Sequence, residues 1–314
     1  MTETIAILCS DIHFSRNPPA ARSSEPDWYK AMGRQWDEVY EISNNGQLPI
    51  IIAGDIFDRW NSPPELINFV IDVFSPFADV LAIPGQHDLP NHVYEERYRS
   101  AYGTLERAGA IRNLDNCNGV ALNDNADAWL FPFPWGLEIE GVEKEDPPPP
   151  AKVAVCHSFI CFEASFPGSE EQTVEKYLPK LKGYDVAVFG DNHRGFKYWA
   201  EDSDTKEQIG LTILNCGTFY RRHSTEIDYK PMVGLLQSDG TIKTHYLDVS
   251  QDEFLSKSDL KDKIEETAEF RELMDELKQL GPDSLDFRQA LRCYMERQDT
   301  DPVVREVVNE ILGF

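Results

Sequence analysis

Long hydrophobic runs are absent from this sequence of 314 residues. No apolar stretch approaches the roughly 18–20 residues that a helix needs to cross a bilayer. Met1–Ser10 leads directly into a strand-like segment and lacks the pattern of a signal peptide. These absences argue against an integral membrane protein and predict a soluble, cytoplasmic chain with no membrane partner.

Cysteine is also scarce, because the sequence has only six, at scattered positions and without a CxxC pair: Cys9, Cys117, Cys156, Cys161, Cys216 and Cys293. Such spacing excludes the dense disulfide framework of small secreted domains. We expect reduced thiols, most of them buried.

Basic residues are few, with 30 Lys and Arg against 55 Asp and Glu, for a formal net charge of −25. This acidic composition is not typical of a nucleic-acid-binding protein, whose phosphate contacts come from an excess of basic side chains. Net charge alone does not exclude one, because divalent cations reverse the local field at a carboxylate-rich site and a basic partner can supply the groove. The hydrophobic share of 41% predicts a large core rather than a disordered acidic chain.

Short apolar runs rich in β-branched residues recur through the first three quarters of the chain and predict buried strands. They are Thr4–Cys9, Ile50–Ala53, Val80–Ile83, Trp129–Phe133, Val153–Cys156, Val186–Phe189 and Leu211–Leu214. Helical patterns lie between several of them, over Asp27–Ser43, Pro64–Phe74, Tyr94–Ala108 and Glu171–Leu181. This alternation predicts an α/β fold.

The last quarter of the sequence has a different pattern. Asp239-Gly240 predicts a hairpin turn between strands Met232–Gln237 and Ile242–Leu247. From Asp252 onward the periodicity is helical, over Phe254–Leu280, Ser284–Arg297 and Pro302–Leu312. We therefore expect a main domain over residues 1–250 and a helical C-terminal appendage over residues 251–314.

Metal-binding side chains gather directly after the predicted strands. Most of the seven histidines lie there, together with aspartates: Asp11, His13, Asp55, Asp58, His87, Asp88, His157, Asp191 and His193. Open α/β folds assemble their sites at the carboxyl ends of strands. Imidazole and carboxylate suit Mn, Fe or Zn, and two ions about 3.5–4 Å apart need a bridging carboxylate such as Asp55. The pattern predicts a site that hydrolyses phosphate esters.

Five motifs carry a family resemblance, in order and spacing: Asp11-Ile12-His13, Gly54-Asp55-Ile56-Phe57-Asp58, Gly85-Gln86-His87-Asp88, His157 and Gly190-Asp191-Asn192-His193. They resemble those of calcineurin-like metallophosphoesterases over roughly residues 1–250. The resemblance implies a two-layer β-sandwich flanked by helices, to which we add the small helical C-terminal element. The segment Asn215–Arg222 with the following hairpin resembles the tail of SbcD-like repair exonucleases, in particular the phage-encoded members.

The resemblance also implies ligands and roles. One metal ion would be held by Asp11, His13, Asp55 and His193, and a second by Asp55, Gln86, His157 and Asp191. His87 would be the transition-state histidine, with Asp88 as its partner carboxylate. Asp58 would orient His13 from behind.

Two positions depart from the family pattern, which has Asn where this chain has Gln86 and His where it has Asp191. Both replacements keep an oxygen that can bind a cation, and oxygen donors favour Mn²⁺, or Mg²⁺, over Zn²⁺. We therefore expect two divalent ions, with Mn²⁺ preferred.

Substrate and partners follow from the resemblance alone. It implies a DNA exonuclease or endonuclease subunit in DNA repair, recombination or phage genome processing, with DNA and an SbcC-like coiled-coil ATPase subunit as partners, and a homodimer as a further assembly. The residues themselves also allow a hydrolase of small phosphoesters, or a non-catalytic assembly subunit.

Further candidates lie close to the motifs. His92, Arg221 and Arg222 are candidate substrate-binding residues, although both arginines would serve equally well in salt bridges. The aromatic residues Trp129, Phe131, Phe133 and Trp135 could stack bases, but their alternation favours core packing.

Overall fold

The computed structural model describes residues 2–115, 119–123, 127–142, 151–164, 169–201, 208–256, 259 and 305. The chain forms two compact units. The first comprises Met1–Arg16, Met32–Tyr220 and Lys230–Val249, and the second comprises Asn17–Ala31, Arg221–Tyr229 and Ser250–Phe314. All of the predicted metal ligands belong to the first unit.

The first sheet of this unit has six strands in the order β12-β11-β1-β2-β3-β4. Their bounds are β12 Ile242–Tyr246, β11 Met232–Gln237, β1 Thr4–Cys9, β2 Ile50–Ala53, β3 Val80–Ile83 and β4 Arg112–Asn113. Strands β1 to β4 are parallel, whereas β11 pairs antiparallel with β1 and with β12. The predicted C-terminal hairpin is thus confirmed, and it completes the edge of this sheet.

The second sheet also has six strands, in the order β5-β6-β7-β8-β10-β9. Their bounds are β5 Val120–Ala121, β6 Ala128–Phe133, β7 Ala151–His157, β8 Val186–Gly190, β10 Gln208–Asn215 and β9 Phe196–Glu201. The four central strands are parallel, and the edge strands β5 and β9 are antiparallel to their neighbours. Parallel central strands bring the carboxyl ends of β7 and β8 to the same edge.

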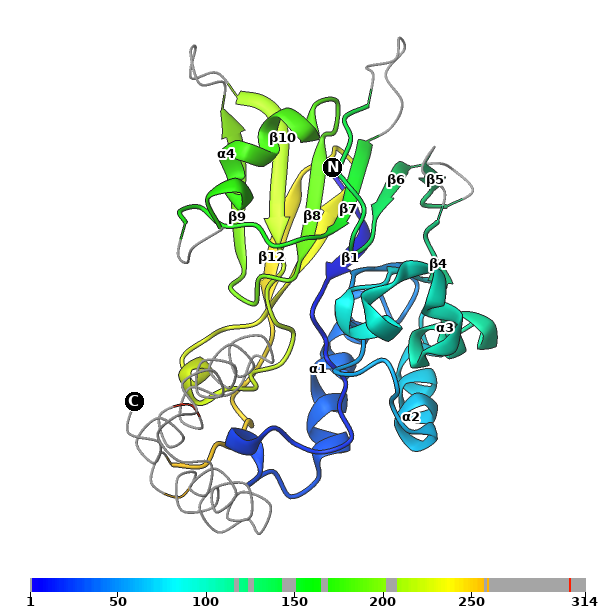
Figure 1. Ribbon diagram of the computed structural model, residues 1–314, viewed down its shortest axis with the longest axis vertical. Helices are drawn as coiled ribbons and strands as arrows, with labels where there is room; N and C mark the ends of the chain where they lie inside the picture. The colour runs from blue at the N-terminus through cyan, green and yellow to red at the C-terminus, as the bar shows by residue number, and fades with distance from the viewer. Residues whose placement is uncertain are drawn as a thin grey trace, which may run out of the picture. The chain divides into compact units, whose positions relative to one another are not determined.

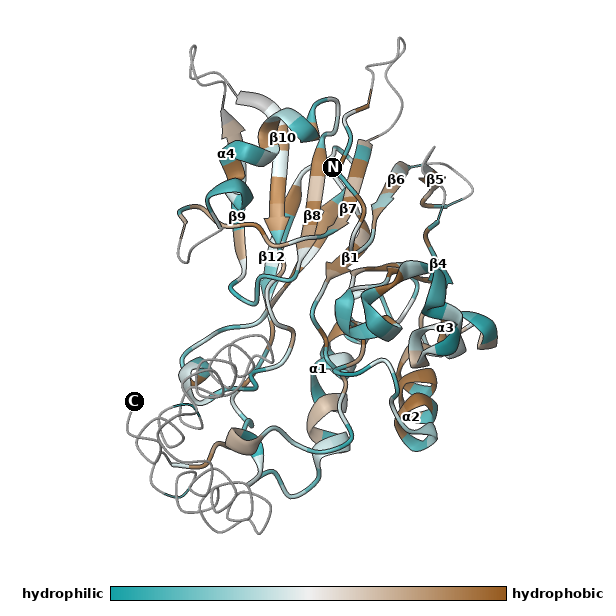
Figure 2. Cartoon of the chain, viewed as in Figure 1, coloured by the Kyte–Doolittle hydropathy of each residue, from teal (hydrophilic) through white to brown (hydrophobic). Residues whose placement is uncertain are grey.

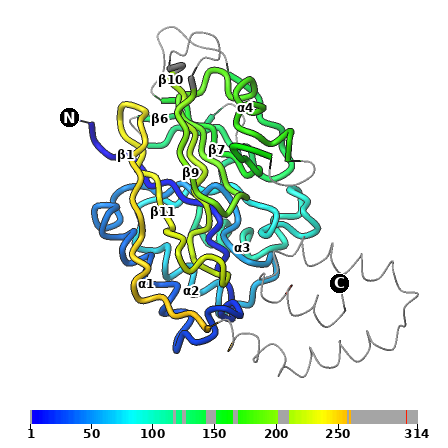
Figure 3. Tube along the Cα trace, turned by 90° about the vertical axis from the view of Figure 1, so that its left-hand side faces the viewer, coloured from blue at the N-terminus to red at the C-terminus, as the bar shows by residue number. Residues whose placement is uncertain are grey.

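Helices cover the sheets, as Figures 1 and 3 show, with the strands lying between α1 and α4. The α-helices are α1 Trp28–Ile42, α2 Pro64–Phe74, α3 Ala101–Ala108 and α4 Val174–Tyr177. Short 3-10 turns occupy Ala20–Arg22, Gln86–Asp88, Pro90–His92, Tyr94–Arg99, Ser169–Gln172, Leu178–Leu181 and Ser224–Glu226. Pro64 suits the first turn of α2, because its missing N–H has no partner there in any helix.

Two hydrophobic clusters hold the layers together. One lies between the sheets and joins residues such as Leu8, Ile51 and Leu81 to Val155 and Val188. The other packs the opposite face of the second sheet against α4. Figure 2 shows how rich β7, β8 and β10 are in hydrophobic residues. The predicted fold class, two sheets flanked by helices, is confirmed.

Beneath the first sheet, aromatic rings fill the space beside α1 and α2. The Trp36 ring of α1 stacks on Phe219 at 4.9 Å and meets Phe74 of α2 edge-on at 5.1 Å. Phe14, which follows β1, contacts Trp36 and Phe74. This aromatic group anchors the loop that carries the first metal-binding motif.

Some predicted elements differ in detail. The predicted helix Tyr94–Ala108 is broken at Ser100, whose side chain caps α3 by accepting the Gly103 N–H at 3.1 Å. The predicted helix Glu171–Leu181 is likewise a 3-10 turn, the short α4 and a second turn. The predicted helices after Asp252 lie outside the described residues.

The cysteines Cys9, Cys156, Cys161 and Cys216 are free and buried, as expected, while Cys117 and Cys293 lie outside the described residues. No helix within the described part of the chain is long and apolar enough to span a bilayer.

Candidate metal centre

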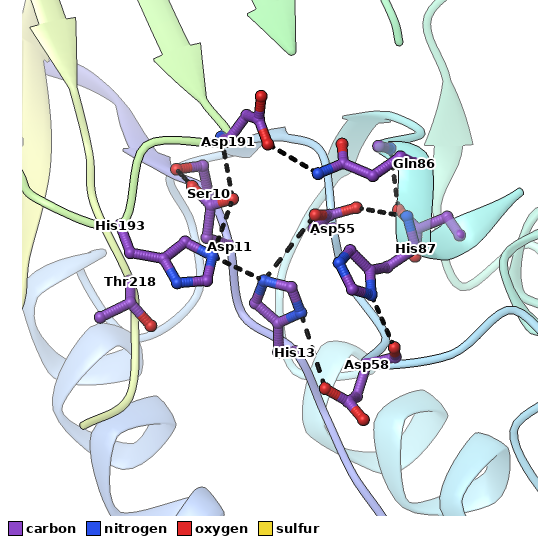
Figure 4. A network of polar contacts seen from close by, with 12 residues as sticks. Ser10, Asp11, His13, Asp55, Asp58, Gln86, His87, Asp191, His193 and Thr218 are labelled. Carbon is purple, nitrogen blue, oxygen red and sulfur yellow. Dashed lines mark hydrogen bonds and ion pairs between the residues drawn. The ribbon is translucent and has the colours of Figure 1, made fainter. Parts of the chain in front are cut away.

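The carboxyl ends of five strands converge at one point of the first unit. Asp11 and His13 follow β1, Asp55 follows β2 and Gln86 follows β3, all in the first sheet. His157 ends β7, and Asp191 and His193 follow β8, in the second sheet. Figure 4 shows the labelled side chains pointing toward one another. The predicted ligands therefore come together from both sheets.

One group of three side chains can hold a cation at the end of β1. The ligand atoms of Asp11, His13 and His193 lie within 4.8 Å of one another. The Nε2 atoms of His13 and His193 are 3.1 Å apart, and Asp11 Oδ1 lies 4.0 Å from His193 Nε2. Asp55 Oδ2 lies 3.7 Å from His13 Nε2. The structure thus brings together the four ligands predicted for the first ion.

A second group lies on the other side of Asp55. His157 Nε2 is 3.3 Å from Asp55 Oδ2 and 2.7 Å from Gln86 Oε1. The Gln86 side-chain N–H donates to Asp191 Oδ1 at 2.6 Å. Gln86 and Asp191, the two departures from the family pattern, therefore contact each other. Asp55 lies beside both groups, where a bridging carboxylate is needed.

The Asp55 carboxylate tests whether these residues fit a cation. Its Oδ1 accepts the backbone N–H of His87 at 2.9 Å, but its Oδ2 is buried and accepts no hydrogen bond from the described residues. A buried carboxylate oxygen without a donor is costly. The Nε2 atoms of His13 and His157 lie 3.7 Å and 3.3 Å from it, and the ligand atoms of Asp11, Asp55 and His157 lie within 4.8 Å of one another. Imidazole nitrogens and carboxylate oxygens both bind divalent cations, so the donor set fits a pair of such ions.

Backbone carbonyls fix the orientation of two histidines. The Nδ1–H of His157 donates to Ala53 O at 2.7 Å, and the Nδ1–H of His87 donates to Asp58 O at 2.9 Å. The Nε2 atom of His87 is left to face the site (Figure 4), and that of His157 lies 2.7 Å from Gln86 Oε1. The Asp58 carboxylate also lies 4.0 Å from His13 Nδ1.

The turns after the strands are left-handed at ligand positions. Asp11, His13, Asp55 and Asp191 have φ values of 49°, 52°, 54° and 86°. Non-glycine residues in this region carry strain that persists where the surrounding structure enforces it, often at functional sites. Gly54 has a φ of +91°, and a Cβ on it would lie 2.0 Å from His157 Nδ1. Only glycine lets the second-sheet histidine reach the end of β2.

Burial and neighbouring charges shift the pKa values of the buried groups. Burial raises the pKa of Asp11. Burial also acts to raise the pKa of Asp55, but the imidazoles of His157 and His87 outweigh it and hold that pKa well below its usual range. For His157, burial acts to lower the pKa, but the Asp55 charge outweighs it and raises the pKa to about 10. Protons and cations therefore compete for the same ligand atoms.

The predicted pairing of His87 with Asp88 is corrected. The Asp88 carboxylate is buried and accepts three backbone N–H groups, from Ile56 at 3.2 Å, Phe57 at 3.0 Å and Gly85 at 3.0 Å. The carbonyl of Asp58, rather than Asp88, holds His87. The Asp88 carboxylate binds backbone N–H groups instead of the His87 imidazole, because the turns after β2 and β3 direct three of these groups at it.

Two further residues form the rim near Gln86. The exposed His92 donates its Nδ1–H to Gln86 O at 3.1 Å. The Trp135 ring lies 6.4 Å from the rings of both His92 and His157. Phe131 is buried in the core beside α4, with Trp129 and Phe133 packed on that cluster, as the core interpretation predicted. Trp135 is not part of this core cluster. Its backbone N–H donates to Pro84 O, and this hydrogen bond places the Trp135 ring beside the site.

The structure places the two candidate arginines in the second unit. The Arg221 guanidinium is ion-paired with Asp252 at 2.9 Å and donates to the carbonyl of Ile227. Arg22 is bonded to the same carboxylate at 2.9 Å and to Glu25. The backbone N–H of Arg222 donates to Glu226. Of the two alternatives for Arg221, the geometry corresponds to the salt bridge.

Asn215, at the end of β10, supports the ligand loop. Its side-chain N–H groups donate to Asn192 O at 2.7 Å and Arg194 O at 2.8 Å, on either side of His193. The backbone N–H of Thr218 donates to His193 O at 3.0 Å. Sequence reasoning assigned neither residue a role, because both act on backbone atoms. The signal available in the sequence was their position in the segment Asn215–Arg222, directly after the predicted strand Leu211–Leu214.

The comparison with known protein families agrees with this geometry. The profile of the calcineurin-like phosphoesterases matches residues 6–195, which include all of the predicted metal ligands. Among solved structures, the phosphopantetheinyl hydrolase PptH from Mycobacterium tuberculosis is 13% identical with a TM-score of 0.39, over 69% of this chain and 89% of that one. A metallophosphoesterase from Sphaerobacter thermophilus is 12% identical with a TM-score of 0.36, over 85% of this chain and 94% of that one. No curated protein matches the sequence.

The matched span covers more than half of the chain and contains every strand end that contributes a predicted metal ligand. This chain therefore belongs to the calcineurin-like phosphoesterase family, whose members are metal-dependent hydrolases.

Proposed function

We propose that this chain is a nuclease that hydrolyses DNA phosphodiesters with two divalent cations, Mn²⁺ by preference. The observation that carries the hydrolytic part is the position of Asp55 between two groups of buried and half-buried ligands. When bound, such a pair of cations polarises the phosphoryl group and activates the attacking water.

The chain's own residues have separate tasks in this reaction. Asp11, His13 and His193 would hold one cation, and Gln86, His157 and Asp191 the other, with Asp55 between them. His87 belongs to neither set of ligands in this proposal, and its Nδ1–H donates to Asp58 O, which leaves Nε2 toward the site (Figure 4). From that position Nε2 can donate a proton to a phosphoryl oxygen or to the departing oxygen.

The choice of cation rests on the donor atoms of the second group. Gln86 and Asp191 offer oxygen where an imidazole would offer nitrogen, and oxygen ligands suit Mn²⁺ and Mg²⁺ better than Zn²⁺. The Gln86 N–H donates to Asp191, which leaves Gln86 Oε1 directed at His157. This orientation supports Gln86 as a neutral oxygen ligand.

The DNA substrate is supported by the segment that resembles SbcD-like nucleases. In this segment Asn215 and Thr218 hold the loop that carries His193, and the backbone N–H of Phe219 donates to Asp11 O at 3.1 Å. The resembling residues are therefore part of the wall of the site. We extend the proposal to a cytoplasmic complex with an SbcC-like ATPase subunit, bound through the C-terminal region, and to a homodimer.

Cleavage of end-labelled linear duplex DNA tests the proposal. The purified chain should degrade this DNA with Mn²⁺, more slowly with Mg²⁺ and not at all with EDTA. Asp55→Ala should lose bound metal and all activity, since it removes the carboxylate between the two groups. His87→Ala should keep its metal and lose turnover by roughly 100-fold or more, the range expected for a general acid. The matched control is His245→Gln, which should remain active. His245 lies on β12 and forms an ion pair with Glu38 of α1.

The other outcomes separate the alternatives. Hydrolysis of a chromogenic phosphodiester without DNA cleavage would point to a hydrolase of small phosphoesters. Absence of both activities, with fewer than two ions bound per chain by elemental analysis, would point to a non-catalytic assembly subunit.

A further inference from the structure

Two solvent-facing side chains of different chemistry lie beside the loop that carries Asp191 and His193. Phe162, in the segment after β7, is 51% exposed although it is a large hydrophobic residue. Arg194, directly after His193, is also exposed. Neither residue has a role in the site described above, and neither is needed to bind a cation.

Two aromatic rings of β9 support the Phe162 ring. It lies 4.3 Å from the Phe196 ring and 5.9 Å from the Tyr198 ring, both on β9. Its own segment is tethered to the ligand loop, because the Asn192 side chain donates to Ile160 O at 2.7 Å. Phe162 thus presents an exposed ring on an aromatic support, in a segment that is hydrogen-bonded to the loop between Asp191 and His193.

Arg194 is unusual in a chain with so many carboxylates. Its guanidinium forms no ion pair or hydrogen bond with the described residues, whereas Arg16, Arg97 and Arg112 are each paired with an acidic residue. The backbone of Arg194 is nevertheless fixed, since its N–H donates to Asn192 Oδ1 at 3.0 Å and its carbonyl accepts from Asn215. A cation on a rigid backbone beside the site is free to meet an anion.

We propose that Phe162 and Arg194 form a nucleotide platform, on which the base next to the scissile phosphate stacks on Phe162 while a flanking phosphate pairs with Arg194. This inference rests on the proposed function and names the part of the substrate that is recognised: an unpaired nucleotide of a DNA strand. Aromatic rings stack any base, and an arginine pairs with backbone phosphate, so the platform binds without reading sequence.

The platform also accounts for the conflict between the net charge of −25 and a DNA substrate. A nuclease that binds a single nucleotide through the Phe162 ring and the Arg194 guanidinium needs no extended basic groove. Its affinity for DNA should consequently depend only weakly on salt, because few counterions are released.

Binding of a fluorescent single-stranded oligothymidine, followed by anisotropy with Ca²⁺ in place of Mn²⁺, tests the platform. Phe162→Ala should weaken binding about tenfold, within the range measured for loss of one base stack. Arg194→Ala should also weaken binding and reduce the salt slope by about one. An oligonucleotide with abasic sites should bind wild-type chain and Phe162→Ala equally, and Phe162→Trp should restore affinity for oligothymidine.

Matched controls come from the same unit. Trp199→Ala removes another aromatic residue of β9 that is 43% exposed, and Arg107→Ala removes an exposed arginine of α3 that has no ion pair among the described residues. Both should bind like the wild-type chain. The two control variants should also hydrolyse bis(p-nitrophenyl) phosphate at the wild-type rate.

The outcomes separate the platform from the nuclease proposal. A wild-type chain that cleaves DNA, with Phe162→Ala and Arg194→Ala binding it as tightly as the wild type, would overturn the platform alone. Equal losses by Phe162→Ala on oligothymidine and on the abasic strand would overturn the stacking role. A wild-type chain that hydrolyses the chromogenic ester but not DNA would overturn the nuclease proposal itself.

Discussion

At the scale of single residues, Gln86 and Asp191 act as a pair. Each replaces a residue type that the family pattern has at that position, and the structure joins them by a hydrogen bond of 2.6 Å. The Asp191 carboxylate accepts the Gln86 N–H and thereby decides which end of the amide faces His157. A change at either residue should therefore affect the second cation through both.

Exchange of the pair tests this coupling. Gln86→Asn shortens the amide by one methylene and Asp191→His removes its acceptor, so each single variant should lose about tenfold or more in Mn²⁺ affinity, as loss of a partner that orients a ligand does. The double variant should recover affinity and shift its preference toward Zn²⁺, because an imidazole is a softer ligand. Isothermal titration with each ion measures this. Additive losses in the double variant would contradict the coupling.

At the scale of elements, Asp88 ties the turn after β2 to the turn after β3. Its carboxylate accepts N–H groups from Ile56 and Phe57 on one side and from Gly85 on the other. Burial, together with the Asp55 charge, raises the pKa of Asp88 to about 7 in spite of these hydrogen bonds. The link between the two strand ends is therefore sensitive to pH.

The sign of this sensitivity can be measured. An ordinary Asp has a pKa of 3.8, so the folded chain holds the Asp88 proton more tightly than the unfolded chain does. The contribution to stability is full below pH 3.8 and is lost as the pH rises through about 7. In urea unfolding with EDTA, wild-type stability should fall between pH 5 and pH 8. Asp88→Asn should be less stable at pH 5 but show a smaller fall, and an equal fall in both would contradict this account.

The elements also show what sequence can predict. Strands β2 and β3 match their predicted bounds because they are buried on both faces and read as continuous apolar runs. The edge strand β9 was missed, since Lys197 and Glu201 interrupt its hydrophobic pattern. The ligands that directly follow these strands could be predicted as well, because the end of each apolar run marks their place in the sequence. The hydrogen-bond partners of Asp88 could not be predicted, because they are three backbone N–H groups that only the folded turns bring together.

At the scale of the whole molecule, the second unit is made from three separate segments of the chain. Arg22 and Arg221 come from the first two, and both pair with Asp252 of the third. The Arg22 side chain is only 2% exposed and that of Asp252 only 1%. A boundary drawn at residue 250 would therefore cut through a buried ion network.

Two truncations test this arrangement together with the proposed ATPase contact. A chain ending at Ser256 keeps Asp252 and should retain ester hydrolysis. In a chain ending at Val249, Arg221 loses its carboxylate and Arg22 keeps only Glu25, so this chain should be roughly 3–5 kcal/mol less stable than the one ending at Ser256, as broken buried pairs are. Neither should bind an SbcC-like ATPase in a pull-down. Retained binding by the shorter chain would contradict the proposal that the ATPase subunit binds the C-terminal region.

The pairing of β11 with β1 has a consequence for how the chain is made. Thr4 of β1 pairs with Gln237 of β11, 233 residues later in the sequence. While the ribosome works through those residues, one edge of β1 has no neighbour, and an open edge invites pairing with other chains. Nascent chains that stall before β11 should therefore be the ones that chaperones must shield.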